Sequence, residues 1–292
     1  MSSILKEKLA ICYVPCGPTY RESAYKRISE DYFDDDNVYY CVLTDDKQYF
    51  SDLKRNNLVV NELKDFYPEY PNVEKNEYFL ESTSKTDYST KFVTQNWLFP
   101  FSTYRFSVLQ ALRLNIKNVA LLNTDTTLNF NVFDNSFFDK VEYFYNAVSE
   151  WDDDTDSKGM QYVVHRLKEK YGLIADKKVR VLDAAARAYI PKSIESLQLF
   201  FDMWNDMVEY LFENNLMHNF RGHYGINDEY ILAPIYNVLN LNKRENHCTS
   251  RIFNVKHDVY NERYWRIGGN GSIKEHMDYE EYIKINNIQS NG

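Results

Sequence analysis

The chain has 292 residues, enough for one large domain or two small ones, and its 44% hydrophobic and 16% aromatic residues exclude an intrinsically disordered protein. The net charge of −9 disfavours nucleic acid as a partner, although a few local cations or a metal ion could still hold a small anionic ligand. The four cysteines lack zinc-finger spacing, the N-terminal apolar run is too short for a signal peptide, and no segment suits a membrane span, so a cytoplasmic protein is expected.

Short apolar runs alternate with helical patterns along the chain. Strands are expected at residues 9–14, 38–43, 58–63, 119–122, 179–182, 189–190 and 252–255. Helices are expected at residues 21–33, 101–114, 162–171, 193–212 and 227–239. Residues 65–95 and 218–225 have the composition of loops, and residues 138–148 are partly extended. This alternation predicts an α/β protein with a mostly parallel central sheet flanked by helices.

The most informative segment runs from Ile116 to Phe130. Its apolar run Val119–Leu122 ends abruptly in Asn123-Thr124-Asp125. Alternate residues of a strand point the same way, so Asn123 and Asp125 are expected to aim at one point beyond the strand's carboxyl end. Oxygen ligands there suit a hard divalent cation that holds a diphosphate, and ligands of open α/β sheets bind at this edge. The alternative is an ordinary turn, in which Asn, Thr and Asp are common.

Two later segments carry residues suited to related chemistry. Asp228 and Glu229 open a helix, where carboxylates are favoured by the helix dipole, although Asp228 could simply cap the helix. His257, Arg263 and Trp265 follow the last expected strand. Imidazole suits Mn²⁺ and guanidinium suits phosphate geometry, whereas the alternative is a surface histidine beside an Arg–Trp stack.

In this order, the segments resemble the nucleotide-sugar-dependent glycosyltransferases of the GT-A fold, a Rossmann-related α/β fold. The likeness is closest to glycosyltransferase family 8, with some likeness to family 6, and it extends from about residue 9 to residue 265. The resemblance implies one GT-A-like domain over residues 1–267, followed by a C-terminal tail at residues 268–292.

The resemblance also implies a metal site. Asn123-Thr124-Asp125 occupies the place of the family's DxD motif, so Asp125 is expected to bind Mn²⁺ (or Mg²⁺) and the donor's diphosphate. Asn123 replaces the first aspartate, and because an amide ligates more weakly than a carboxylate, metal affinity should fall. His257 corresponds to a further metal ligand. Arg263 stands where the family has a lysine that grips the diphosphate, and Trp265 keeps the family's spacing from it.

Other positions correspond to donor and acceptor contacts of the family. Arg105 matches a donor-contacting arginine, Tyr20 matches a tyrosine that stacks on the nucleotide base, and Asp183 would face the donor sugar. Asp228 and Glu229 would lie under the reacting sugar carbon. There they could orient the acceptor hydroxyl, support the developing oxocarbenium charge or, in an inverting enzyme, act as general base.

The expected function is therefore transfer of a hexose or pentose from a nucleotide sugar, a UDP-sugar by this resemblance, to a hydroxyl of a glycan or glycoconjugate. The two families favour retention of configuration. One alternative is a catalytically degenerate member that binds nucleotide or glycan, which Asn123 supports. Another is a metal-dependent phosphoester hydrolase built on Asp152–Asp156, which contains a literal DxD. Charge runs are, however, usually solvated faces, and no clean buried strand precedes this one.

Overall fold

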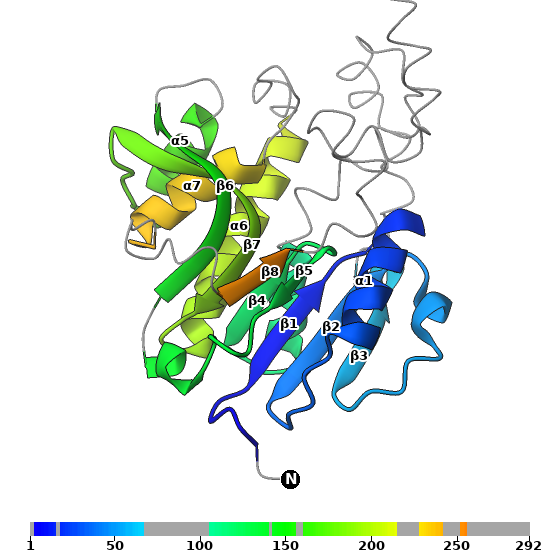
Figure 1. Ribbon diagram of the computed structural model, residues 1–292. Helices are drawn as coiled ribbons and strands as arrows, with labels where there is room; N and C mark the ends of the chain where they lie inside the picture. The colour runs from blue at the N-terminus through cyan, green and yellow to red at the C-terminus, as the bar shows by residue number, and fades with distance from the viewer. Residues whose placement is uncertain are drawn as a thin grey trace, which may run out of the picture.

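The computed structural model describes residues 3–15, 18–66, 105–139, 142–155, 160–214, 228–241 and 252–255. Within these residues, six strands form a central sheet in the order β3-β2-β1-β4-β7-β6, and β5 pairs with β8 in a small second sheet (Figure 1). The strands are β1 (Leu9–Tyr13), β2 (Val38–Thr44), β3 (Leu58–Glu62), β4 (Asn118–Leu122), β5 (Thr126–Leu128), β6 (Glu142–Asp154), β7 (Lys178–Ile190) and β8 (Phe253–Val255).

The first four strands of the sheet, β3, β2, β1 and β4, are parallel, whereas β7 and β6 add to them in antiparallel pairs. Every residue of β1 and β4 is buried. Continuous burial of this kind follows when both faces of a parallel sheet are covered, and it explains why these strands are unbroken apolar runs in the sequence. The prediction of a mostly parallel α/β sheet flanked by helices is confirmed.

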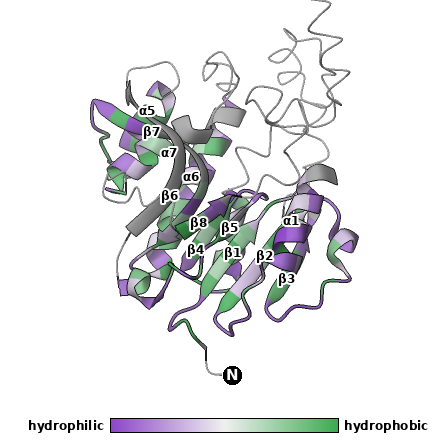
Figure 2. Cartoon of the chain, in the orientation of Figure 1, coloured by the Kyte–Doolittle hydropathy of each residue, from purple (hydrophilic) through white to green (hydrophobic). Residues whose placement is uncertain are grey.

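Alternate side chains of each strand enter two separate cores. Ala10 and Cys12 of β1 join a core with the helices on one face, while Leu9, Ile11 and Tyr13 join a core on the other face. The helix α1 (Pro18–Glu30) covers the second face, and α6 (Ile194–Glu213) and α7 (Asp228–Val238) cover the first (Figure 1). In Figure 2 the central strands are coloured mainly as hydrophobic, whereas α1 is coloured largely as hydrophilic.

The expected helices are present with small shifts. α1 begins at Pro18, three residues before the expected Arg21, because proline is well tolerated in the first helical turn. Residues 105–113 are helical and match the second half of the expected helix 101–114, whose beginning lies outside the described residues. The helix α5 (Gln161–Tyr171) ends at Gly172, whose positive φ of 67° lets its N–H bond the carbonyls of Leu167 and Lys168. The short helical elements are η1 (Lys47–Phe50), α2 (Leu63–Phe66) and η3 (Asn135–Asp139).

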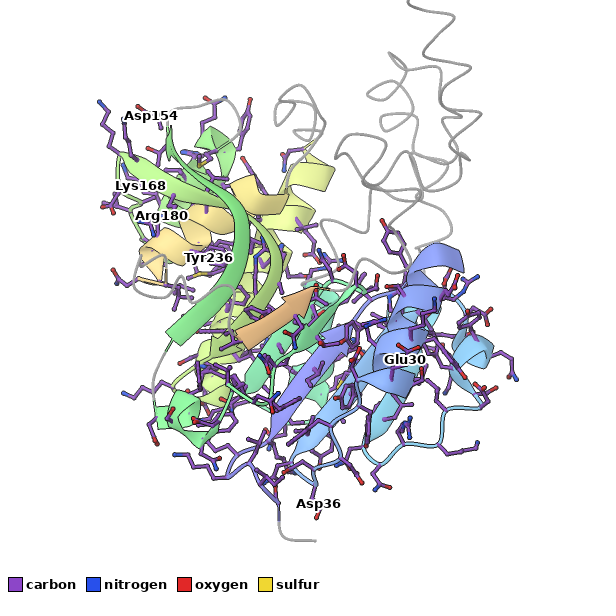
Figure 3. All side chains as sticks on the ribbon, in the orientation of Figure 1. Glu30, Asp36, Asp154, Lys168, Arg180 and Tyr236 are labelled. Carbon is purple, nitrogen blue, oxygen red and sulfur yellow. The ribbon has the colours of Figure 1, made fainter. Side chains whose placement is uncertain are left out.

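The sequence prediction was wrong about the extent of the strands in the antiparallel half of the sheet. The two strands expected at 179–182 and 189–190 are one strand, β7, because β6 pairs with it along its whole length. β6 itself runs on to Asp154, so the first half of the acidic run Asp152–Asp156 belongs to a strand. Asp152 lies opposite Arg180, and Asp154 lies opposite Lys178. Figure 3 shows Asp154 and Arg180 at the end of the molecule remote from α1, which carries Glu30.

Several sequence predictions concern residues that the structure does not describe. They are the expected loop at 218–225, most of the expected loop at 65–95, and the tail at 268–292. In the part of the chain that is described, no helix has both the length and the apolar character that crossing a bilayer requires.

Candidate functional site

The carboxyl end of β4 leads into a turn that carries two of the expected metal-site residues. The strand ends at Leu122, and the N–H of Thr126 donates to the carbonyl of Asn123 at 3.0 Å. Residues 123–126 therefore form a turn, so the strand alternation expected to align Asn123 with Asp125 does not apply here. The side chain of Asn123 is exposed, whereas Asp125 is half-buried and accepts a hydrogen bond from the Thr126 hydroxyl at 3.1 Å.

Two buried hydroxyl groups hold this turn against the rest of the sheet edge. Ser23 of α1 donates to the carbonyl of Thr124 at 2.8 Å, and Tyr13, the last residue of β1, donates to the carbonyl of Thr126 at 2.8 Å. Burial raises the pKa of Tyr13 well above its usual value, so the phenol keeps its proton and remains a donor. The backbone on both sides of Asp125 is thus held by β1 and α1, which fixes where its carboxylate can lie.

An ion pair borders the same edge between α1 and β2. Arg21 Nη1 lies 2.6 Å from Asp45 Oδ1, directly after the end of β2, and its guanidinium lies 5.6 Å from the ring centroid of Tyr49. Tyr20, the residue expected to stack on a base, precedes Arg21 in the first turn of α1 and is half-buried. It lies one helical turn before Ser23, so it stands on the part of α1 that reaches the turn of Asp125.

Arg105, the expected donor-contacting arginine, also lies near this edge. The thiol of Cys12, the penultimate residue of β1, contacts the carbonyl of Ser107 at 3.4 Å. The beginning of helix 105–113 therefore lies against the carboxyl half of β1. Arg105 is buried, and its guanidinium lies 5.0 Å from the ring centroid of Phe106.

The small second sheet brings a distant segment to the turn. β8 pairs antiparallel with β5, so that Val255 lies opposite Thr126, the neighbour of Asp125. His257, Arg263 and Trp265 follow β8 but lie outside the described residues.

The remaining predicted residues are described by their backbone only. Ala186 of β7 lies opposite Leu122, and because these strands are antiparallel, Asp183 lies in the part of β7 that runs beyond the end of β4. Register shifts interrupt the ladder close by, at Ala147 of β6. Such bulges often occur beside binding sites. Asp228 and Glu229 begin α7, and their roles stay predictions.

A divalent cation would find only part of a site in the described residues. They contain no group of three His, Cys, Asp or Glu side chains placed to hold a metal ion. Asp125 supplies a carboxylate and Asn123 an amide oxygen, both of which suit a hard cation. The described residues fit the edge of such a site, and further ligands would have to come from other parts of the chain.

Sequence reasoning missed Tyr13, Arg21 and Ser23. Arg21 and Asp45 are 24 residues apart, and only the parallel pairing of β1 with β2 brings the two strand ends together. A possible signal was the position of Tyr13 and Asp45 at the ends of neighbouring apolar runs.

Comparisons with known proteins identify the fold of this chain. No protein-family model matches the sequence, and no curated protein sequence matches it. Among solved structures, the chain is similar to the mannosyltransferase Ktr4p from S. cerevisiae in complex with GDP, with a TM-score of 0.54, 13% identity, and coverage of 85% of this chain and 71% of that one. It is also similar to core-mannan synthase A (CmsA/Ktr4) from Aspergillus fumigatus in an Mn/GDP form, with a TM-score of 0.53, 12% identity, and coverage of 85% and 74%.

The chain has the fold of the GT-A glycosyltransferases. At this level of identity the likeness concerns the fold, and it does not single out family 8.

Proposed function

We propose that this protein is a glycosyltransferase that moves a sugar from a nucleotide diphosphate donor to a hydroxyl of a glycan or glycoconjugate. The observation that carries the proposal is the turn of Asp125 at the carboxyl end of β4, held by Tyr13 and Ser23 and paired through β5 with β8. In an open α/β sheet, this edge is where a ligand binds.

The reaction leaves negative charge on the departing diphosphate, and the site must stabilise that charge. The bond between the anomeric carbon and the diphosphate oxygen breaks, a bond to the acceptor oxygen forms, and the acceptor hydroxyl loses its proton. A bound divalent cation would offset the charge of the departing diphosphate. In this proposal Asp125, Asn123 and His257 hold the cation, while Arg263 and Arg105 face the phosphates. Asp228 or Glu229 acts on the acceptor hydroxyl in this proposal.

The sequence resemblance and the similar solved structures favour different bases for the donor nucleotide. The sequence resemblance suggests uridine, whereas the two similar solved structures contain GDP. Tyr20 would stack on either base, with Trp265 and Asp183 completing the donor contacts. We therefore propose a nucleotide-sugar donor and leave its base to the binding experiment below.

Binding of GDP and UDP, each with and without Mn²⁺, tests the proposal directly. A ligand that binds only the folded protein raises its melting temperature, and calorimetry then measures the affinity. The replacement Asp125→Asn should lower the Mn²⁺-dependent part of the affinity at least about tenfold, since it removes a charged ligand. If neither nucleotide binds at millimolar concentration with Mn²⁺ present, the proposal is wrong.

Asp154→Asn is the matched control, because Asp154 belongs to the alternative metal site in the acidic run. Asp154 lies opposite Lys178 in the ladder of β6 and β7, so a basic residue stands across from it in the sheet. Nucleotide affinity should therefore stay within about twofold of the unmodified protein. Release of free nucleotide from a nucleotide sugar separates an enzyme from a binding protein: binding without any turnover would identify a non-catalytic member.

A further inference from the structure

Two cysteines lie opposite each other in the first two strands of the sheet. Cys12, the penultimate residue of β1, pairs directly with Cys41 of β2 in the parallel ladder. Both residues are fully buried and belong to the same core, so their side chains lie on the same face of the sheet. Both are free thiols in this structure. Neither cysteine has a role in the proposed transfer reaction.

The ladder places these two residues at a separation that a disulfide can bridge. Neighbouring strands lie about 4.8 Å apart. The Cα atoms of a disulfide are usually about 4.4–6.8 Å apart, so the backbones of β1 and β2 already meet this requirement. The two side chains also interact, since burial and a hydrogen bond with Cys41 both raise the pKa of the Cys12 thiol. Closure of the bond therefore needs rotation of the side chains and little movement of the strands.

The other contacts of the two thiols are weak. Cys12 donates to the carbonyl of Ser107 at 3.4 Å, near the beginning of helix 105–113. The Cys41 thiol has a longer contact, at 4.0 Å, with the carbonyl of Tyr39 on its own strand. A thiol is a weak hydrogen-bond donor, so these contacts oppose rotation of the side chains only slightly.

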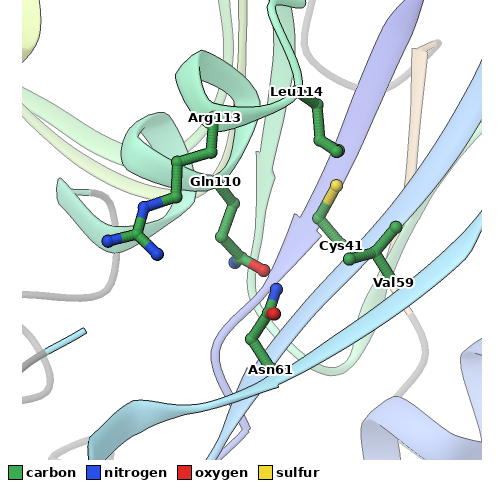
Figure 4. Close-up of a pocket in the computed structure, with 6 residues that line it drawn as sticks. All are labelled: Cys41, Val59, Asn61, Gln110, Arg113 and Leu114. Atoms are coloured by element: carbon green, nitrogen blue, oxygen red, sulfur yellow. The ribbon is translucent and has the colours of Figure 1, made fainter. Parts of the chain in front are cut away.

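A small cavity beside Cys41 gives a reagent access to one of the two sulfur atoms. Its volume is about 120 Å³, and it is lined by Cys41, Val59, Asn61, Gln110, Arg113 and Leu114 (Figure 4). In Figure 4 the Cys41 sulfur is directed from β2 toward Leu114 of the helical segment. Arg113 is exposed and Leu114 is half-buried, so this wall of the cavity belongs to the rim of the core. A water molecule occupies about 30 Å³ in the liquid, so the cavity has room for a molecule as small as hydrogen peroxide.

We propose that Cys12 and Cys41 form a peroxide-sensitive dithiol that closes to a disulfide. The Cys41 sulfur attacks one oxygen of the peroxide and loses its proton, the O–O bond breaks, and Cys41 becomes a sulfenic acid while one water leaves. The Cys12 sulfur then attacks the Cys41 sulfur, the S–O bond breaks, and the hydroxyl group leaves with the Cys12 proton as a second water. Two thiols and one hydrogen peroxide thus give one disulfide and two waters.

The disulfide changes the contact between the sheet and helix 105–113. Oxidation removes the Cys12 proton, so the carbonyl of Ser107 loses the thiol that donates to it. Oxidation therefore acts on the segment that carries Arg105, which the proposed function places at the donor phosphates. Formation of the disulfide itself does not depend on that function, and its test involves no nucleotide.

Mass spectrometry of the full-length protein tests this inference. The sequence holds four cysteines, so the double variant Cys16→Ser and Cys248→Ser keeps only this pair. After brief treatment with hydrogen peroxide, we expect its intact mass to fall by two hydrogen atoms and dithiothreitol to restore it. Digestion without a reductant should yield the peptide of Cys12 joined to that of Cys41. If the folded protein keeps both thiols while the same chain in urea is oxidised, the proposal is wrong.

Single replacements in the same background separate the roles of the two sulfur atoms. Cys12→Ser removes the partner that closes the bond, so peroxide should leave a sulfenic acid on Cys41, which dimedone traps. Cys41→Ser removes the cysteine that lines the cavity, so dimedone labelling should be at least about tenfold lower than in Cys12→Ser. The melting temperature before treatment checks that each variant is folded. Equal labelling of the two folded variants would also overturn the proposal.

Discussion

Replacing Tyr13 by phenylalanine removes one oxygen atom from the structure that fixes the turn of Asp125. Tyr13 is 1% exposed, and its hydroxyl donates to the carbonyl of Thr126 at 2.8 Å. The variant loses this bond and leaves a buried carbonyl without its donor, while the aromatic ring still fills its place. The expected loss in the free energy of unfolding is about 1–2 kcal/mol, which corresponds to a fall in melting temperature of roughly 2–4 °C.

Urea unfolding measures this loss, and its dependence on pH makes the test sharper. Burial raises the pKa of Tyr13 in the folded protein above the unfolded value of about 10. The folded state therefore holds the phenol proton more tightly, so the contribution of Tyr13 is complete below about pH 10 and declines above it, as the unfolded chain ionises. The difference between the two proteins should be constant from pH 7 to about pH 10 and should shrink at higher pH.

Tyr171→Phe is the matched control for this experiment. Tyr171 donates to the carbonyl of Asp202 in an exposed contact at 3.3 Å, so its loss should cost no more than about 0.5 kcal/mol at neutral pH. Equal losses for the two variants, or a Tyr13→Phe difference that does not change above pH 10, would refute the argument that a buried hydroxyl holds the turn.

Two further predictions concern stability away from the site. Burial alone would raise the pKa of the Asp35 carboxyl. Hydrogen bonds from the Ser3 hydroxyl and from the N–H groups of Asn37, Ile4 and Leu5 outweigh this effect and lower that pKa. Asp35→Asn should therefore cost about 1–3 kcal/mol at pH 7 in urea unfolding. This cost should shrink as pH falls below about 4, because the unfolded chain then takes up a proton at Asp35 before the folded protein does. An unchanged cost at pH 3 would contradict this argument. Gly172→Ala should lower the free energy of unfolding by about 1 kcal/mol. The cost comes from the positive φ alone, because no atom lies within 4 Å of an added Cβ. Gly172→Asn should cost less in the same assay, since asparagine tolerates this conformation better, and equal costs would point to a steric cause.

Much of the parallel half of the fold could be predicted from the sequence. The apolar runs of β1, β2 and β4 mark their strands within a residue or two, because strands buried on both faces carry mostly apolar side chains. The same logic failed for β7. Its polar middle residues interrupt the apolar pattern, yet hydrogen bonds to β6 keep it in one strand.

The candidate site, too, could be predicted from the sequence only in part. The end of an apolar run at Leu122 already marked Asn123 and Asp125, since a strand that stops on polar oxygens carries a local signal. The direction of these side chains was decided by the turn that follows, and the partners of that turn, Tyr13 and Ser23, come from other elements.

Chain order and apolar spacing were thus sufficient to indicate an α/β sheet with a polar carboxyl edge, because both depend on residues close in the sequence. Tertiary structure alone decided that Arg21 meets Asp45, that Val255 lies beside Thr126, and that Gln110 shares a cavity with Asn61. Each of these pairings depends on strand order and register or on helix packing, which arise from many weak contacts acting together, so the local sequence around one partner does not identify the other.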